Sequence, residues 1–178
     1  MDTYISLLRG INVSGQKKIR MQDLKALYEA LDFNRVNTYI QSGNVVFDAA
    51  GSEIRRRIEE AIRKQFGFEV PVLLRTADEF GAIVQANPFL KQAGIDLSKL
   101  HVTFLEQVPG PSAIEALSKL QSGSDEYRVL GQEVYLYCPN GYGRSKLTNT
   151  ALEKKLQIGA TTRNWKTVLQ LYGMAGPE

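Results

Sequence analysis

The stretch Val36-Asn37-Thr38-Tyr39-Ile40-Gln41-Ser42-Gly43-Asn44-Val45-Val46-Phe47 predicts a β-hairpin, and this hairpin decides the fold class. β-Branched and aromatic residues stand on both sides of a short polar segment that carries one glycine. We therefore expect strands over 36–40 and 45–47, joined by a tight turn at 41–44. The hairpin explains the glycine, but the amide side chains in the turn could also hydrogen-bond a polar ligand.

Elements of alternating type flank this hairpin. The residues before it predict a strand at 3–9 and a helix at 21–31, in which leucines recur at helical spacing. The residues after it predict a helix at 52–66 and a strand at 70–75, whose proline favours a sheet edge. The order strand, helix, strand, strand, helix, strand is the split βαβ pattern of ferredoxin-like folds.

The second part of the chain repeats this order less completely. We expect helix 76–86, a polar loop at 87–99, strand 101–106, helix 112–120, strands 127–130 and 133–138, and helices 145–156 and 162–172. A closing helix stands where a fourth strand would fall, and no residue-level repeat is visible. The prediction is an α+β protein of two ferredoxin-like halves in tandem. Residues 1–76 form the first half, and residues 77–178 form a linker helix plus a second half that ends in helices.

The composition of the chain limits the classes of protein to which it can belong. The chain has 178 residues, of which 43% are hydrophobic and 23% charged, as in an ordinary globular protein. The net charge of +3 is too small to identify a nucleic-acid binder. No apolar run is long enough to span a membrane, and the start of the chain lacks the layout of a signal peptide. We expect a cytoplasmic protein without a membrane partner.

Cys138 and His101 are the only residues of their types. A single cysteine excludes an intrachain disulfide, and one histidine with one cysteine cannot form a metal site built from several of these residues. A Cys–His nucleophile pair would require the fold to bring the two together. A magnesium site made of carboxylates alone stays open. We predict no metal site, and the sequence identifies neither a cofactor nor a catalytic residue.

The loop over residues 9–20 is the most unusual connection, with four cations, two glycines and no acid. It is not a P-loop, because Gln16 and Lys17 follow the second glycine where that motif needs Lys and then Ser or Thr. A looser anion cradle is open, since backbone N–H groups before a helix lack internal partners. In the split βαβ topology this loop and the turn at 41–44 share one sheet edge, so we expect one polar rim.

Two basic segments of the second half precede predicted helices. In residues 141–146 we expect Ser145 to cap the helix that follows. In residues 161–166 we expect Thr162 to be the cap, which would place Arg163 and Lys166 in the first turn. A cation there is unfavourable for the helix dipole, so a bound phosphate or a carboxylate partner is expected.

The candidate ligand-binding residues are the basic and polar residues of these loops. They are Arg9, Gly10, Asn12, Lys17, Lys18, Gln41, Ser42, Asn44, Arg144, Lys146 and Arg163. Whether the basic clusters of the two halves converge is left open at this point.

Three segments together carry a family resemblance. They are Leu7-Leu8-Arg9-Gly10-Ile11-Asn12-Val13, Thr38-Tyr39-Ile40-Gln41-Ser42-Gly43-Asn44-Val45 and Ala160-Thr161-Thr162-Arg163-Asn164-Trp165. They resemble the uncharacterised, mainly bacterial family known as domain of unknown function 1697, over nearly the whole chain. The resemblance implies a duplicated ferredoxin-like fold. It implies no activity, substrate or cofactor.

The leading functional hypothesis is the binding of an anionic ligand at the rim: a nucleotide, a phosphorylated metabolite or a nucleic-acid backbone. An enzyme that uses the same rim, or a protein-interaction module, are the alternatives. An RNA-recognition domain shares the strand order and would use aromatic residues such as Tyr4 and Phe47. The glycine-rich motif that such domains carry on the third strand is absent here. The oligomeric state is not predicted.

Overall fold

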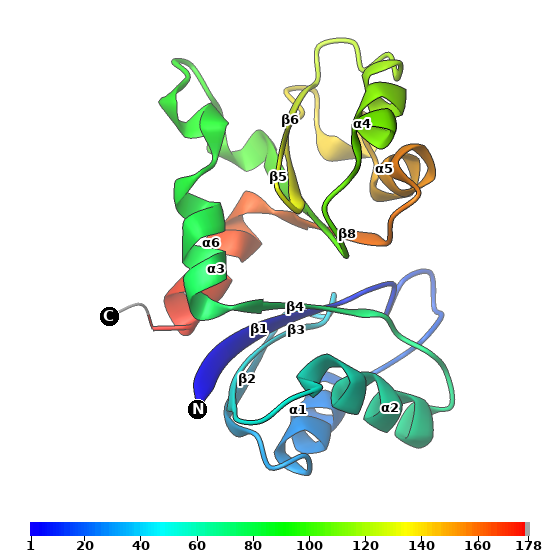
Figure 1. Cartoon of the computed structure of the whole chain (residues 1–178), viewed down its shortest axis with the longest axis vertical. Coiled ribbons are helices and arrows are strands. Elements are labelled where there is room, and N and C mark those ends of the chain that lie inside the picture. The colour runs from blue at the N-terminus through cyan, green and yellow to red at the C-terminus, as the bar shows by residue number, and fades with distance from the viewer. Residues whose placement is uncertain (177–178) are drawn as a thin grey trace. The chain divides into compact units, whose positions relative to one another are not determined.

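The computed structural model describes residues 1–176 and divides the chain into two compact units. Of the described residues, one unit contains 1–82 together with 170–176, and the other contains 83–169. The described residues form two four-stranded antiparallel sheets and six α-helices (Figure 1). The protein is therefore of the mixed α+β class, as the sequence predicts.

The first unit follows the predicted order of elements. These are β1 (Asp2–Leu8), α1 (Met21–Glu29), β2 (Asn34–Tyr39), β3 (Asn44–Ala49), α2 (Ile54–Phe66) and β4 (Val72–Thr76), after which α3 (Ala77–Gln85) begins. The sheet order is β2-β3-β1-β4, with every neighbouring pair antiparallel. β1 and β2 consequently run in the same direction, so the end of β1 lies at the same edge as the β2–β3 turn.

α1 and α2 pack on one face of the sheet of this unit (Figure 1). Leu24 and Tyr28 of α1 and Ile58 of α2 are fully buried against Phe47 of β3. α2 begins at Ile54, two residues later than the sequence predicts. Its N-cap is Glu53 in a left-handed conformation, and no side chain caps the helix. The buried isoleucine stripe of α2 therefore determines where it packs without help from a cap.

The second unit contains a strand that the sequence analysis missed. The elements after α3 are the short 3₁₀ turns Pro88–Lys91 and Leu97–Lys99, then β5 (Leu100–Leu105), α4 (Pro111–Ser118), β6 (Glu126–Leu130), β7 (Glu133–Tyr137), α5 (Asn149–Leu156), β8 (Ala160–Asn164) and α6 (Trp165–Met174). The second unit ends within α6, at residue 169. β8 pairs with β5, and the sheet order is β6-β7-β5-β8. The predicted helix at 162–172 was wrong at its start, because threonines at 161 and 162 favour a strand.

This correction changes the role of Arg163. It lies within β8 opposite Val102, not in the first turn of a helix. The cap of α6 is Asn164, whose Oδ1 accepts a 2.8 Å hydrogen bond from the Thr167 amide. The expectation was therefore wrong for Arg163, whereas Lys166 does lie in the first turn of α6.

Ser145 is also not a helix cap. It follows a 3₁₀ turn at Tyr142–Arg144, and its hydroxyl accepts from the Leu147 amide at 2.9 Å. α5 begins later, where the Thr148 side chain accepts a hydrogen bond from the Ala151 amide. Residues 145–148, which were predicted to be helical, lie outside α5. The hydrogen bond between the Ser145 hydroxyl and the backbone amide two residues later favours a turn there and competes with helix formation.

Backbone hydrogen bonds at the end of the first strand correspond between the two units. The amide of Leu8 donates to the Gly43 carbonyl at 2.8 Å, and the amide of Leu105 donates to the Gln132 carbonyl at 2.8 Å. The amide of Arg9 donates to the Pro71 carbonyl at 3.0 Å, and the amide of Glu106 donates to the Gly159 carbonyl at 2.9 Å. Each acceptor directly precedes the fourth strand of its unit. The connection that follows differs: it covers residues 9–20 in the first unit but only residues 106–110 in the second.

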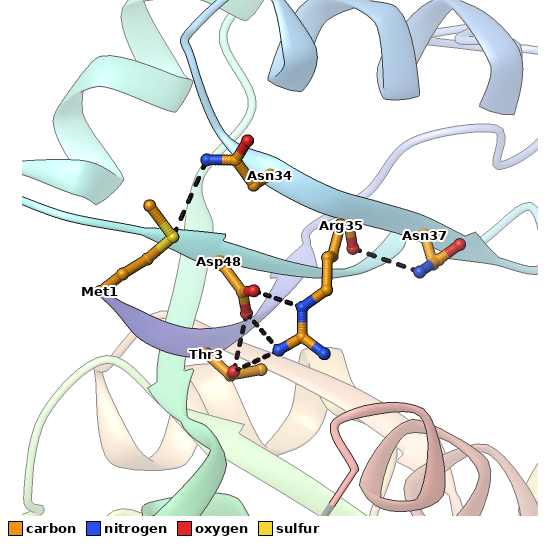
Figure 2. Close-up of polar contacts among 6 residues, drawn as sticks. All are labelled: Met1, Thr3, Asn34, Arg35, Asn37 and Asp48. Carbon is orange, nitrogen blue, oxygen red and sulfur yellow. Dashed lines mark hydrogen bonds and ion pairs between the residues drawn. The ribbon is translucent and has the colours of Figure 1, made fainter.

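The opposite end of β1 carries a polar cluster that the sequence did not indicate (Figure 2). The register of β2 shifts between Asn34 and Asn37, and Arg35 has a left-handed φ of +47°. This bulge turns the Arg35 guanidinium onto both carboxylate oxygens of Asp48. The hydroxyl of Thr3 donates to the same carboxylate at 2.7 Å.

We expect this cluster to make stability depend on pH. Hydrogen bonding from Arg35 lowers the pKa of the Asp48 carboxyl, with a smaller contribution from Thr3. A lowered native pKa contributes stability above the unfolded pKa of about 3.9, and this contribution is lost as the pH falls through the native pKa. The free energy of unfolding of wild type should therefore exceed that of Asp48→Asn most near neutral pH. Below about pH 4 the difference should narrow.

Urea unfolding of both proteins at several pH values between 7 and 3 measures this difference. Arg35→Gln should show the same narrowing against wild type, because it removes the partner that lowers the pKa. If the difference in free energy of unfolding between wild type and Asp48→Asn stayed constant from pH 7 to pH 3, the Asp48 carboxyl would not be the source of the pH dependence.

Candidate functional site

The predicted adjacency of the two loops is confirmed by direct hydrogen bonds. The side-chain amide of Asn12 donates to the backbone carbonyl of Gln41 at 2.8 Å. The backbone bond from Leu8 to Gly43 joins the same two segments one step earlier. Residues 9–20 and 41–44 are together called the rim below.

Asn12 holds the rim together. Its Nδ2 donates to the Ile19 carbonyl at 2.9 Å as well as to Gln41, and its Oδ1 accepts from the Ile19 amide at 2.9 Å. Both N–H groups of the side chain are thereby used within the protein. Asn12 is consequently a structural residue of the rim rather than a group available to a ligand.

The tip of the long loop is a small hairpin. The Asn12 amide donates to the Lys17 carbonyl at 3.1 Å, and the Gln16 amide donates to the Val13 carbonyl at 2.9 Å. Ser14 and Gly15, which lie between Val13 and Gln16, have φ values of +51° and +74°, the positive values that a type I′ turn requires. Lys17 is anchored too, because its Nζ donates to the Glu69 carbonyl at 2.7 Å. The loop is therefore an ordered element.

The turn residues of the rim also have structural partners. Asn44 is fully buried, and its Nδ2 donates to the Tyr39 carbonyl at 2.8 Å and to the Ser42 hydroxyl at 3.0 Å. Gly43 has a φ of +87° and lies against Ile11. The amide of Asn44 is thus not exposed to a ligand, unlike the side chain of Gln41, which is exposed.

Arg9 and Gly10 open the loop. Arg9 is half-buried, and its amide donates to the Pro71 carbonyl at 3.0 Å. Gly10 is exposed, with a left-handed φ of +72° and open space where a side chain would stand. Lys18 differs from the anchored residues: it is exposed, and within residues 1–176 no hydrogen bond or ion pair engages its ammonium group.

A depression of about 610 Å³ lies at the rim. It is lined by Asn12, Gly15, Lys18, Ile19, Arg20, Asp23, Gln41 and Phe66. Arg20 and Asp23 form an ion pair of 2.9 Å, whereas Lys18 carries a positive charge that no carboxylate neutralises at close range. The depression therefore combines a cation, an amide side chain and an aromatic ring.

Phe66 lines the depression, although the sequence does not predict it as a site residue. It is the last residue of α2, directly before the glycine that ends the helix, and it is half-buried. Its position in the final turn of a helix whose other apolar residues are buried was the available signal. Nothing in the sequence placed that turn beside the long loop, because their contact depends on tertiary packing.

Arg144 and Lys146 lie in the second unit and line a depression of their own. It has a volume of about 460 Å³ and also includes Asn140 and the loop at 121–125. Arg163 is only 7% exposed, and burial lowers the pKa of its guanidinium to about 10. Its NH1 donates to the Thr161 hydroxyl at 2.7 Å, so it belongs to the packed sheet and not to an open binding surface.

The structure does not join His101 and Cys138 by a hydrogen bond. The His101 ring stacks on Tyr142 with 4.5 Å between centroids, and its Nδ1 has no hydrogen-bond partner among the described residues. Burial raises the pKa of the Cys138 thiol, which disfavours the thiolate that a nucleophile needs. Within residues 1–176 no three His, Cys, Asp or Glu side chains gather as metal ligands. None of the helices described has the length and apolar character to cross a membrane.

Residues 1–135 match the family described as Protein of unknown function (DUF1697). The chain belongs to this family. The DUF1697 match includes both rim segments and ends before the third motif at 160–165. The structure is similar to that of the conserved bacterial protein SP0830 from Streptococcus pneumoniae, with a TM-score of 0.78 and 22% sequence identity over 98% of each chain. That similarity establishes a shared fold. No curated protein matches the sequence.

Proposed function

We propose that this protein binds an anionic ligand at the rim, of the class of a nucleotide, a phosphorylated metabolite or a nucleic-acid backbone. The supporting observation is that an ordered loop, clamped by Asn12, presents an unpaired Lys18 beside a depression. The equivalent connection of the second unit needs only residues 106–110. The first connection is therefore longer than this strand-to-helix connection requires, although Ile11 and Ile19 anchor it in the core. Loops carry function more often than framework residues do.

The residues proposed to contact the ligand are narrower than the set expected from the sequence. Lys18 supplies the positive charge, the exposed Gln41 side chain supplies a hydrogen-bonding amide, and Gly15 leaves its backbone accessible. Asn12 and Asn44 act indirectly, by holding the loop and the turn in place. A cytoplasmic location is part of this proposal, since a free buried cysteine suits a reducing compartment.

We also infer that the two units are ferredoxin-like halves that arose by duplication. Their sheet orders correspond strand by strand, as β2-β3-β1-β4 and β6-β7-β5-β8. The Arg75–Ile5 pairing in the first sheet occupies the same position as the Arg163–Val102 pairing in the second. A helix begins directly after the fourth strand in each unit. The proposed function then depends on a loop that distinguishes one half from the other.

Titration of the protein with inorganic pyrophosphate tests the proposed site. We expect the backbone amide NMR signals of Gly15, Lys18 and Gln41 to shift, with an affinity that weakens as salt is added. Lys18→Gln should weaken binding about tenfold, since it removes a charge-assisted hydrogen bond. Lys64→Gln is the matched control, because Lys64 is an exposed cation of the same unit outside the depression. Equal weakening by both variants, or no shift at the rim, would refute the proposal.

A further inference from the structure

We propose that the ligand of the rim carries a flat aromatic ring beside its anionic group, with a nucleoside monophosphate as the simplest example. The ring would lie against Phe66 and the phosphate at Lys18. This inference rests on the proposed function and adds the chemical class of the ligand.

The size and lining of the depression favour a ligand larger than a phosphate ion. Its volume of about 610 Å³ is within the range of roughly 300–1,000 Å³ typical of small-molecule sites. An inorganic anion at Lys18 would leave most of this space, including the Phe66 ring, without a contact. An apolar moiety attached to the anion would cover that ring.

Phe66 is supported as a stacking surface. Its ring stacks on that of Phe68, with 6.1 Å between centroids and 25° between planes, and both pack on the core of the first unit. Phe66 lines the depression, whereas Phe68 does not. A ring held from one side and open to a cavity on the other can receive a base without losing further side-chain freedom. Such stacking contributes about 1–3 kcal/mol per base.

Polar groups beside Phe66 match the remainder of a nucleotide. Lys17 donates to the Glu69 carbonyl, which brings a second positive charge to the segment that follows Phe66. Arg20 holds the Asp23 carboxylate at 2.9 Å, where a free oxygen lone pair can accept from a sugar hydroxyl. The depression thus offers separate surfaces for a ring, for hydroxyl groups and for a phosphate.

A free mononucleotide fits better than a nucleic-acid strand. Binding several bases requires a row of exposed aromatic side chains, as on the open sheet of an RNA-recognition domain. Here Phe47 of β3 is fully buried, with its ring 5.1 Å from that of Tyr28 and 4.8 Å from that of Phe33. Phe66 is the one aromatic residue among those lining the depression.

The test compares adenosine monophosphate, ribose 5-phosphate, inorganic phosphate and a five-residue oligoadenylate as ligands of the full chain, by calorimetry and amide NMR. We expect adenosine monophosphate to bind at least about tenfold more tightly than ribose 5-phosphate. Phe66→Leu should remove this preference and leave ribose 5-phosphate binding unchanged. Tyr4→Leu is the matched control, because Tyr4 is also a half-buried aromatic residue on the core of the first unit but does not line the depression. It should alter the affinity for adenosine monophosphate less than about twofold. Urea unfolding of both variants verifies that they fold.

The outcomes separate the two proposals. Equal binding of adenosine monophosphate and ribose 5-phosphate at the rim would overturn the proposal that the ligand carries an aromatic ring. It would leave the proposed function, anion binding at the rim, supported. No binding of any of the four ligands would overturn both. Tighter binding of the oligoadenylate than of the mononucleotide, with shifts beyond the rim, would overturn the mononucleotide in favour of a strand.

Discussion

Gly43→Ala is expected to lower the free energy of unfolding by about 3 kcal/mol. A Cβ at this position would lie 2.6 Å from Cδ1 of Ile11 and 2.9 Å from Cβ of Leu8. Both neighbours are buried core residues, so neither can move away freely. The φ of +87° adds a steric cost of about 1–2 kcal/mol for any residue with a Cβ, and overpacking adds about 1–3 kcal/mol.

Gly51→Ala is the matched control for this prediction. Gly51 has a φ of +96°, but no atom lies within 4 Å of the position that its Cβ would occupy. It should therefore show only the backbone cost of about 1–2 kcal/mol. Urea unfolding of the two variants and wild type measures both losses. If the two variants were equally destabilised, the close approach of the long loop to the turn would not be the cause.

Asn12→Ala is expected to cost about 2–3 kcal/mol of stability and to abolish ligand binding at the rim. The substitution removes three hydrogen bonds, each contributing about 1 kcal/mol, and leaves the amide of the buried Ile19 without its partner. Alanine also tolerates the φ of +55° less well than asparagine does. The loop should detach from Gln41, because the side-chain bond between them is lost.

Hydrogen exchange at the Ile19 amide reports on this detachment directly, and urea unfolding reports on the stability. Asn140→Ala serves as the control, since Asn140 is exposed and its side chain makes a single hydrogen bond of 2.9 Å to Ser124. We expect that control to lose less than about 1 kcal/mol. Continued protection of the Ile19 amide in Asn12→Ala would contradict the proposed clamp.

Much of the first unit could be predicted because its signals are local. The hairpin at 36–47 combines β-branched residues with turn residues, and the stripe of Ile54, Ile58 and Ile62 defines a helix face. Once these elements are known, the rules of strand connection place the loop at 9–20 beside the turn at 41–44. The hydrogen bond between Asn12 and Gln41 confirms that placement.

β8 shows where local signals were insufficient. Residues 160–164 form only a short strand, directly followed by a helix with a strong apolar pattern. The helical periodicity was therefore extended too far toward the N-terminus. Pairing with β5, which lies about sixty residues earlier in the chain, decides the strand, and such pairing is a tertiary property.

The sequence by itself determined the α+β class, the order of the elements in the first unit and the adjacency of the two rim segments. Periodicity and turn chemistry depend on neighbouring residues, so one chain is sufficient to read them. Only the tertiary structure decided which polar side chains are available to a ligand. Asn12 and Asn44 look equivalent to Gln41 in the sequence, yet their amides bond to backbone groups distant along the chain or buried in the turn. Phe66 joined the site for the same reason, because its environment is made by a segment some fifty residues away.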